Sequence, residues 1–181
     1  MENNFIATYD NVLSKDQCQH LIDKFEDSKV QWQKTELKDH RSFTEININA
    51  YEDWKDYEKI IYTTLRPYID RYAERFKITH NWPERFGWEQ IRFKKYEVNG
   101  IDEFKEHVDV MDYASAKRFL VFFLYLNDNT GGLTDFPEYD TMITPKAGKL
   151  LMFPPLWTHK HIGHKPLEQP KYIVGSYLHY A

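Results

Sequence analysis

The sequence predicts a β-rich α+β domain in which two N-terminal helices cover one face of a β-sandwich or jelly roll. Helical spacing of apolar residues dominates before about residue 88, and short runs of β-branched and aromatic residues follow it. The chain has 181 residues, of which 41% are hydrophobic, enough for one domain with a core. We therefore expect a single domain over 1–181, with a helical cover and edge strands in 1–87 and the jelly-roll core in 88–181.

Two segments are predicted to be helical. Ser14 and Gln17 form a capping-box pattern at the start of the first helix. The second helix is expected over 54–76, where apolar and aromatic residues keep the helical period for about six turns. Pro67 lies inside this segment and predicts a kink or a break. The first helix should bury one apolar stripe, made of Cys18, Leu21, Ile22 and Phe25.

The remaining ordered segments read as strands. A short strand is expected at 5–9, and weak alternation at 43–49 indicates a strand at a sheet edge. Runs rich in β-branched and aromatic residues follow, separated by Gly, Pro, Asn and Asp. We expect strands there at 91–98, 118–127, 139–144, 149–153 and 172–180.

Composition argues against several classes of protein. The net charge of −4 disfavours a nucleic-acid partner, because such domains are usually strongly basic. Cys18 is the single cysteine, so no internal disulfide can form and a cytoplasmic location is the simpler expectation. The N-terminus does not read as a signal peptide, and no apolar stretch is long enough to cross a membrane.

Two distant segments carry residues that bind metals. His107 and Asp109 lie two apart and would share a side of an extended strand. Three further histidines follow at 159, 161 and 164. Two histidines and one carboxylate form the facial triad of non-haem Fe(II) oxygenases. A structural zinc clip built from the three downstream histidines is the alternative, and it would leave His107 and Asp109 unexplained.

The order of the motifs supports the first alternative. HVD, YLND, GGLTDFP, PKAGKLLMF, HIG and Lys171 follow one another between about residues 93 and 178. This ordered set resembles the prolyl 4-hydroxylase-like branch of the 2-oxoglutarate- and Fe(II)-dependent dioxygenases, in its compact bacterial or phage form. The resemblance implies a double-stranded β-helix (a cupin-like jelly roll). It also implies that Fe(II), 2-oxoglutarate as cosubstrate and O2 are required, with ascorbate as a supporting reductant.

The resemblance also assigns site residues. His107, Asp109 and His161 match the catalytic iron ligands, and His161 is chosen because Gly163 and Lys171 follow it at the family spacing. His159 could orient a ligand or line the barrel, and His164 is expected in a loop. The cosubstrate pocket is expected to include Lys171, which would meet the distal carboxylate of 2-oxoglutarate, and also Tyr96, Tyr125 and Thr134.

By resemblance, the expected activity is a procollagen-proline 4-dioxygenase-like hydroxylation of prolyl residues in a protein or peptide, with release of succinate and CO2. One alternative is hydroxylation of a free amino acid or another small metabolite. Another is a catalytically silent β-roll that only binds a partner. Demethylation of nucleic acid is disfavoured by the acidic charge balance. The sequence does not predict an oligomeric state.

Overall fold

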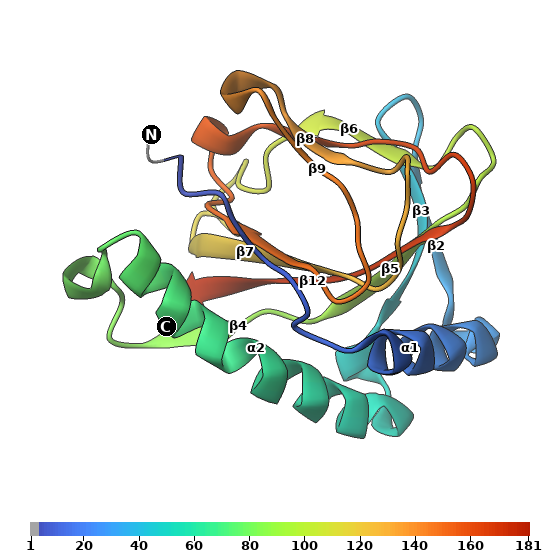
Figure 1. Cartoon of the computed structure of the whole chain (residues 1–181), viewed down its shortest axis with the longest axis horizontal. Coiled ribbons are helices and arrows are strands. Elements are labelled where there is room, and N and C mark those ends of the chain that lie inside the picture. Colours follow the sequence, from blue (N-terminus) through green and yellow to red (C-terminus); the bar gives the residue numbers. More distant parts are fainter. Residues whose placement is uncertain (1–3) are drawn as a thin grey trace.

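A computed structural model describes residues 4–181, and its strands form one curled antiparallel sheet that closes into a jelly roll (Figure 1). The strand order is β1-β10-β7-β12-β5-β3-β6-β11-β8-β9, with β4 paired to β12 and β2 paired to β3. Helices α1 and α2 lie together beneath one side of this roll (Figure 1). The predicted fold class, a jelly roll covered by N-terminal helices, is confirmed.

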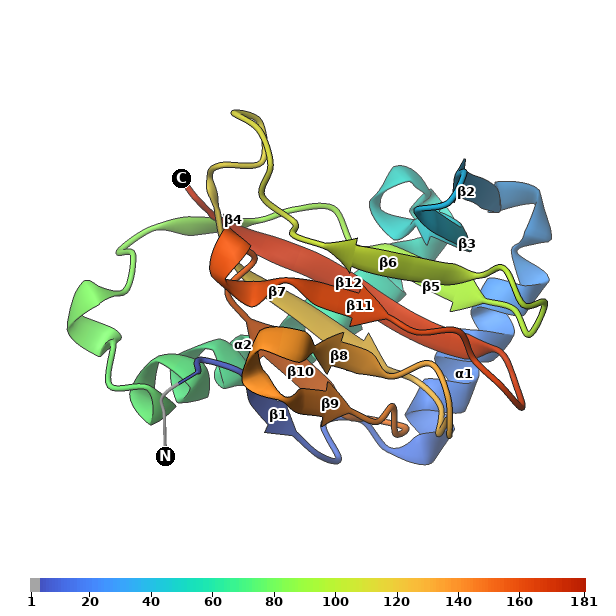
Figure 2. The ribbon, with the colours of Figure 1, turned by 90° about the horizontal axis from the view of Figure 1, so that it is seen from above.

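The sheet bends into two layers, which Figure 2 shows from above. One layer contains β1 (Ala7–Tyr9), β10 (Leu150–Phe153), β7 (Arg118–Tyr125), β12 (Lys171–Tyr180), β5 (Arg92–Tyr96) and β3 (Arg41–Asn47), flanked by β4 (Phe86–Trp88) and β2 (Gln33–Leu37). The other contains β6 (Glu103–His107), β11 (His161–Gly163), β8 (Thr134–Phe136) and β9 (Thr141–Ile143). Within residues 4–181, six short 3-10 helices occupy connections: Lys29–Gln31, Ile48–Ala50, Glu52–Trp54, Thr79–Asn81, Pro137–Tyr139 and Trp157–His159.

Helix α1 (Lys15–Asp27) begins at the predicted cap. The Ser14 hydroxyl accepts a hydrogen bond from the Gln17 amide at 3.1 Å, and the Gln17 side chain accepts one from the Ser14 amide at 2.9 Å. The four residues of the predicted apolar stripe are all buried. Helix α2 (Lys55–Arg75) continues through Pro67, so no break occurs there. No helix within residues 4–181 is long and apolar enough to cross a bilayer.

Strand β3 differs from its prediction. It was expected at an edge, but it pairs with β2 on one side and with β5 and β6 on the other. Phe43 and Ile46 on this strand point to opposite faces, and both are buried. A strand covered on both faces loses the clean apolar and polar alternation, and this explains why its position in the sheet was misjudged.

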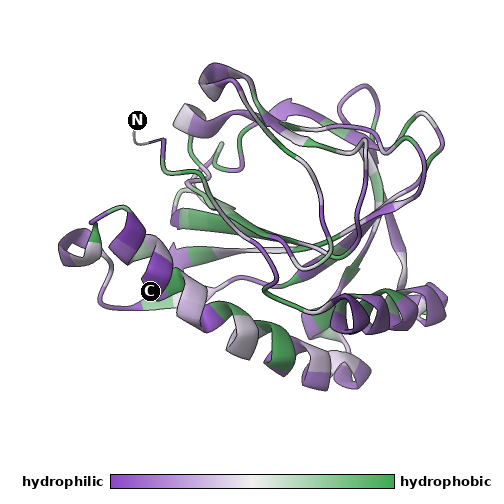
Figure 3. Cartoon of the chain, viewed as in Figure 1, coloured by the Kyte–Doolittle hydropathy of each residue, from purple (hydrophilic) through white to green (hydrophobic). Residues whose placement is uncertain are grey.

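Two buried clusters hold the layers together. The larger lies between the helices and the sheet and includes Phe25, Trp54 and Phe93. The smaller lies between the two layers of the roll and includes Phe43, Phe136 and Phe153. Figure 3 shows apolar residues along the strands above the helices and mostly hydrophilic residues on the visible side of α1. The smaller cluster forms the wall behind the residues described next.

Candidate metal centre

His107, Asp109 and His161 meet at one end of the roll. His107 is the last residue of β6, and it lies opposite His161, the first residue of β11, in the antiparallel ladder. Asp109 follows just beyond β6, where its amide donates to the carbonyl of Pro155 at 3.2 Å. The Nε2 atoms of His107 and His161 lie 3.8 and 3.7 Å from the Asp109 carboxylate oxygens. One ligand atom from each of the three lies within 4.8 Å of the others.

A backbone carbonyl orients the imidazole ring of His107, and another orients that of His161. The Nδ1 atom of His107 lies 2.7 Å from the carbonyl oxygen of Lys105, and that of His161 lies 3.1 Å from the carbonyl oxygen of His159. Because a carbonyl only accepts, each Nδ1 carries a proton, so the tautomer of a neutral ring here is the one with its lone pair on Nε2. Burial, followed by the nearby His161 ring, lowers the pKa of His107 to about 3. His107 is therefore neutral at physiological pH.

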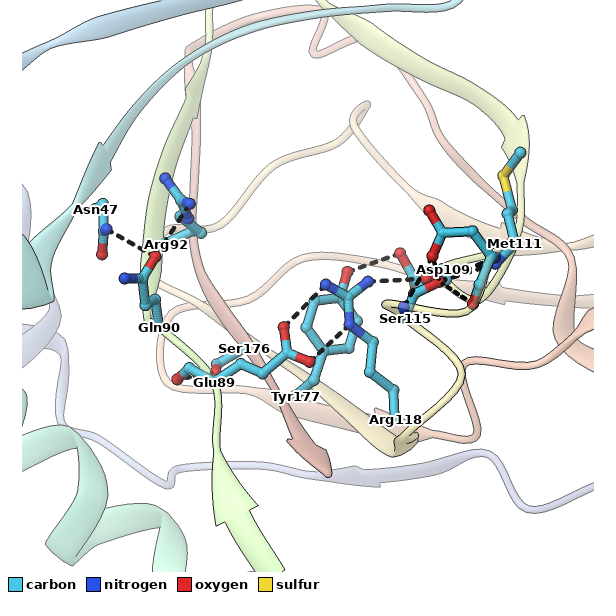
Figure 4. Close-up of polar contacts among 11 residues, drawn as sticks. Asn47, Glu89, Gln90, Arg92, Asp109, Met111, Ser115, Arg118, Ser176 and Tyr177 are labelled. Carbon is cyan, nitrogen blue, oxygen red and sulfur yellow. Dashed lines mark hydrogen bonds and ion pairs between the residues drawn. The ribbon is translucent and has the colours of Figure 1, made fainter. Parts of the chain in front are cut away.

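The carboxylate is held in the same way. Asp109 Oδ1 accepts a hydrogen bond from the Tyr177 hydroxyl at 2.7 Å (Figure 4). Asp109 Oδ2 and His161 Nε2 are buried and have no hydrogen-bond partner within residues 4–181. Buried polar atoms without a partner are costly, and two that lie 3.7 Å apart fit a shared cation. Two imidazoles and one carboxylate are a donor set suited to Fe(II) with open positions left over.

The side chains of His159 and His164 contact other groups of the chain. His159 places Nε2 at 2.8 Å from the carbonyl of Asn4 and Nδ1 at 2.8 Å from the hydroxyl of Thr158. His164 places Nε2 at 3.1 Å from the carboxylate of Asp135. Their side chains therefore do not join His161 in a zinc clip. His159 contributes through its backbone, whose carbonyl orients the His161 ring.

Lys171 lines the same interior cavity as His107, Asp109 and His161. Its side chain is 2% exposed, and its ammonium donates to the carbonyl of Gly132 at 2.9 Å. No carboxylate of residues 4–181 forms an ion pair with it, and burial, followed by the charge of Lys94, lowers the pKa of Lys171 to about 7. A buried ammonium without a counter-ion is unfavourable, so the cavity suits an anionic ligand.

Gly132 explains part of the GGLTDFP motif. Its φ of +61° lies in the left-handed region, and a Cβ atom there would be 2.9 Å from Cδ of Lys171. Glycine meets both requirements, because it tolerates positive φ and allows close approach. The turn thus presents its carbonyl to the lysine ammonium.

The other predicted pocket residues divide into two groups. Tyr96 and Thr134 line the cavity, and the Tyr96 ring lies 4.3 Å from the Lys171 ammonium. Tyr125 does not line it. Its buried hydroxyl instead donates to that of Thr134 at 2.7 Å. The structure therefore brings together all the predicted residues except Tyr125, which contacts the cavity through Thr134.

A supporting group around Asp109 was missed. Arg118 forms two hydrogen bonds of 2.9 Å with Glu89, donates to the Asp109 carbonyl at 2.8 Å, and lies 4.0 Å from the Tyr177 ring centroid (Figure 4). This places the Tyr177 hydroxyl against the carboxylate. One signal was present in the sequence. Tyr177 lies an even number of residues after Lys171, and side chains at even spacing share one face of a strand.

Known proteins resemble this chain in sequence family and in fold. Residues 91–179 match the family model described as the 2OG-Fe(II) oxygenase superfamily. No curated protein matches the chain by sequence.

Among solved structures, a viral collagen prolyl hydroxylase from Paramecium bursaria Chlorella virus-1 superposes with a TM-score of 0.69 at 18% identity, covering 99% of this chain and 98% of that one. A prolyl hydroxylase from Trichoplax adhaerens, solved with a hypoxia inducible factor peptide, gives 0.77 at 16% identity, with coverage of 98% and 84%. A Pseudomonas putida prolyl-4-hydroxylase gives 0.69 at 14%, with coverage of 99% and 94%. At these identities the likeness establishes the fold.

Proposed function

The chain belongs to the 2OG-Fe(II) oxygenase superfamily through residues 91–179, and from that premise we propose that it hydroxylates prolyl residues in a protein or peptide, releasing succinate and CO2. The observation that carries the proposal is the pairing of two features in one cavity. Atoms of Asp109 and His161 that have no hydrogen-bond partner within residues 4–181 face it, and it is also lined by the buried ammonium of Lys171, which forms no ion pair with a carboxylate of those residues.

The roles we propose for the residues follow from this cavity. His107, Asp109 and His161 hold Fe(II), and Lys171 binds the distal carboxylate of 2-oxoglutarate. Bound Fe(II), together with 2-oxoglutarate and O2, supplies the oxidation of a C–H bond to C–OH, coupled to decarboxylation of the cosubstrate. Ascorbate would serve as a reductant that keeps the metal in the Fe(II) state. Tyr96 and Thr134 form the wall of the cosubstrate pocket, and Tyr125 fixes the orientation of the Thr134 hydroxyl.

The surrounding side chains limit water at this site. The Phe153 ring lies 4.9 Å from the His161 ring in an edge-on arrangement, and Phe123 lies 6.2 Å from it. The His107 ring stacks on Phe104 with a centroid distance of 3.4 Å. Apolar walls of this kind strengthen electrostatic contacts inside the cavity and protect a reactive species from side reactions.

A peptide substrate is favoured over a small metabolite by the space beside the metal site. A groove of about 880 Å³ lies beside His107 and Asp109, and residues of β3, β5 and β12 also line it. The similar solved structures include prolyl hydroxylases, one of them bound to a peptide fragment. We also propose that residues 1–181 act as one unit in the cytoplasm, where a chain with a single, buried cysteine needs no disulfide.

The test is a screen of proline-containing peptides with the Fe(II)-loaded protein, 2-oxoglutarate and O2. We expect succinate to form in step with a peptide mass gain of one oxygen, located on proline by fragmentation. Asp109→Ala should remove both signals. Turnover of free amino acids with no peptide oxidation would contradict the proposal. Succinate formation with oxidation at a residue other than proline would also contradict it.

A further inference from the structure

The groove beside the metal site opens onto the same residues as the interior cavity. Lys94, His107, Asp109 and Tyr177 line both spaces. A substrate lying in the groove would therefore reach the metal-binding residues directly. Inward-facing residues of β3 and β5, Lys94 among them, form part of the groove wall.

These two strands place three cations in the groove, namely Arg41, Arg92 and Lys94. None of the three forms an ion pair with a carboxylate of residues 4–181. Arg92 has one side-chain hydrogen bond, to the neutral Gln90 at 3.3 Å (Figure 4). The chain has more acidic than basic residues, 28 against 24, so carboxylates are available elsewhere.

Lys95, the next residue on β5, differs from Lys94 because it forms ion pairs. Lys95 points to the opposite face of the strand and is paired with both Glu26 and Glu97, each at 2.7 Å. Lys94 instead places its ammonium 4.7 Å from the centroid of the Phe43 ring. Such a contact orients a cation without neutralising it. Glu45 lies opposite Lys94 in the ladder and also lines the groove, but within residues 4–181 it forms no ion pair with the three cations, and its carboxylate accepts a hydrogen bond from Thr35 at 2.8 Å.

Arg41 has the same kind of environment as Lys94. Its guanidinium lies 5.5 Å from the Phe104 ring centroid, and its Nε atom is buried with no hydrogen-bond partner within residues 4–181. Elsewhere in the groove Arg118 pairs with Glu89, and Asp112 and Lys117 carry charges of opposite sign. The unpaired positive charge is therefore concentrated on the β3 and β5 side.

We propose that Lys94, together with Arg92 and Arg41, forms an anion-binding subsite of the substrate groove, so that the peptide hydroxylated by this protein carries a carboxylate side chain close to the target residue. This inference rests on the proposed function and adds a preference for an acidic peptide. Lys94 is the central member because it alone of the three also lines the interior cavity. Recognition by an aspartate or glutamate would give each partly buried cation the counter-ion that the chain itself does not supply.

The test measures binding without turnover. Protein loaded with Fe(II) and 2-oxoglutarate under anaerobic conditions is titrated into labelled proline peptides that differ only in a flanking Asp, Asn or Lys, and anisotropy is recorded. We expect the Asp peptide to bind about tenfold more tightly than the Asn peptide, which is about 1.4 kcal/mol. In Lys94→Met, this preference should fall below about threefold. Lys59→Met, which removes an exposed charge on α2, should leave it unchanged.

Three results would overturn the inference. The Asp and Asn peptides could bind equally, or their difference could survive in Lys94→Met. Alternatively, Lys94→Met could weaken 2-oxoglutarate binding as strongly as peptide binding, which would assign Lys94 to the cosubstrate. We expect 2-oxoglutarate affinity, read from the visible band of its Fe(II) complex, to change by less than the affinity for the Asp peptide. A thermal melt of each variant checks that it is folded.

The same peptides separate the two proposals when O2 is admitted. Hydroxylation of proline with no preference for the Asp peptide would reject the subsite and keep the prolyl function. Lys94-dependent preference for the Asp peptide with no proline oxidation would keep the subsite and reject the prolyl function.

Discussion

The phenol of Tyr177 gives a direct test of how the carboxylate ligand is positioned. In Tyr177→Phe the ring remains beneath Arg118, and the 2.7 Å hydrogen bond to Asp109 Oδ1 is lost. A hydrogen bond to a charged acceptor contributes about 1.5–3 kcal/mol. Loss of a partner that orients a metal ligand lowers metal affinity about 10–100-fold. We therefore expect the Kd for Fe(II) to rise by about 10–100-fold.

The assay is an anaerobic Fe(II) titration in competition with a chelating dye. Burial raises the pKa of Tyr177 well above its ordinary value, so the phenol is a donor throughout the neutral range and the effect should not depend on pH there. Tyr72→Phe is the matched control, because its phenol donates to the carbonyl of Phe5 at 2.7 Å, in a contact of α2 away from the site. An Fe(II) Kd for Tyr177→Phe within twofold of wild type would refute the reasoning.

Three further predictions concern the cosubstrate pocket. Lys171→Met should weaken 2-oxoglutarate binding about 100-fold and leave Fe(II) affinity unchanged, because the buried carboxylate of the cosubstrate would lose its counter-ion. Spectroscopic titration measures both affinities, and an equal loss of Fe(II) affinity would contradict the assignment. The pKa of Lys171 is about 7, so the ammonium loses its proton as pH rises. The Kd for 2-oxoglutarate should therefore increase by up to about tenfold per pH unit between pH 7 and 9. A Kd that does not change with pH would refute this role of the Lys171 charge. Gly132→Ala should destabilise the fold by about 1–2 kcal/mol in denaturant melts, because its φ of +61° is unfavourable for alanine, and unchanged stability would contradict that reading.

The sequence predicted the helices and most strands, because their signals lie in residues that are close together along the chain. The capping box of α1 needs only Ser14 and Gln17, and both of its hydrogen bonds are formed. Strand β2 was missed because its sequence, QKTEL, is polar and lacks apolar alternation; pairing with β3 makes it a strand. The break expected at Pro67 is absent, and α2 buries Leu65 and Ile69 on either side of it.

The three candidate metal ligands could be selected from the sequence because they lie in spaced motifs. The choice of His161 over its neighbours depends on side-chain direction, which spacing indicates and the structure shows through the contacts of His159 with Asn4 and Thr158. Lys94 and Tyr177 could not be selected in this way. The chain has 13 tyrosines, and only the fold determines which phenol faces Asp109. In the same way, only the fold determines which groove lysine forms no ion pair with a carboxylate of residues 4–181.

The central claim is that His107, Asp109 and His161 hold Fe(II) at a cavity where Lys171 receives 2-oxoglutarate. The most direct measurement is the visible spectrum of the apo protein after anaerobic addition of Fe(II) and then 2-oxoglutarate, recorded for wild type, His161→Ala and His164→Ala. The account predicts the weak charge-transfer band of a chelated keto acid in wild type and His164→Ala, and its loss in His161→Ala. No band in folded wild-type protein, or a band that persists in His161→Ala, would contradict it.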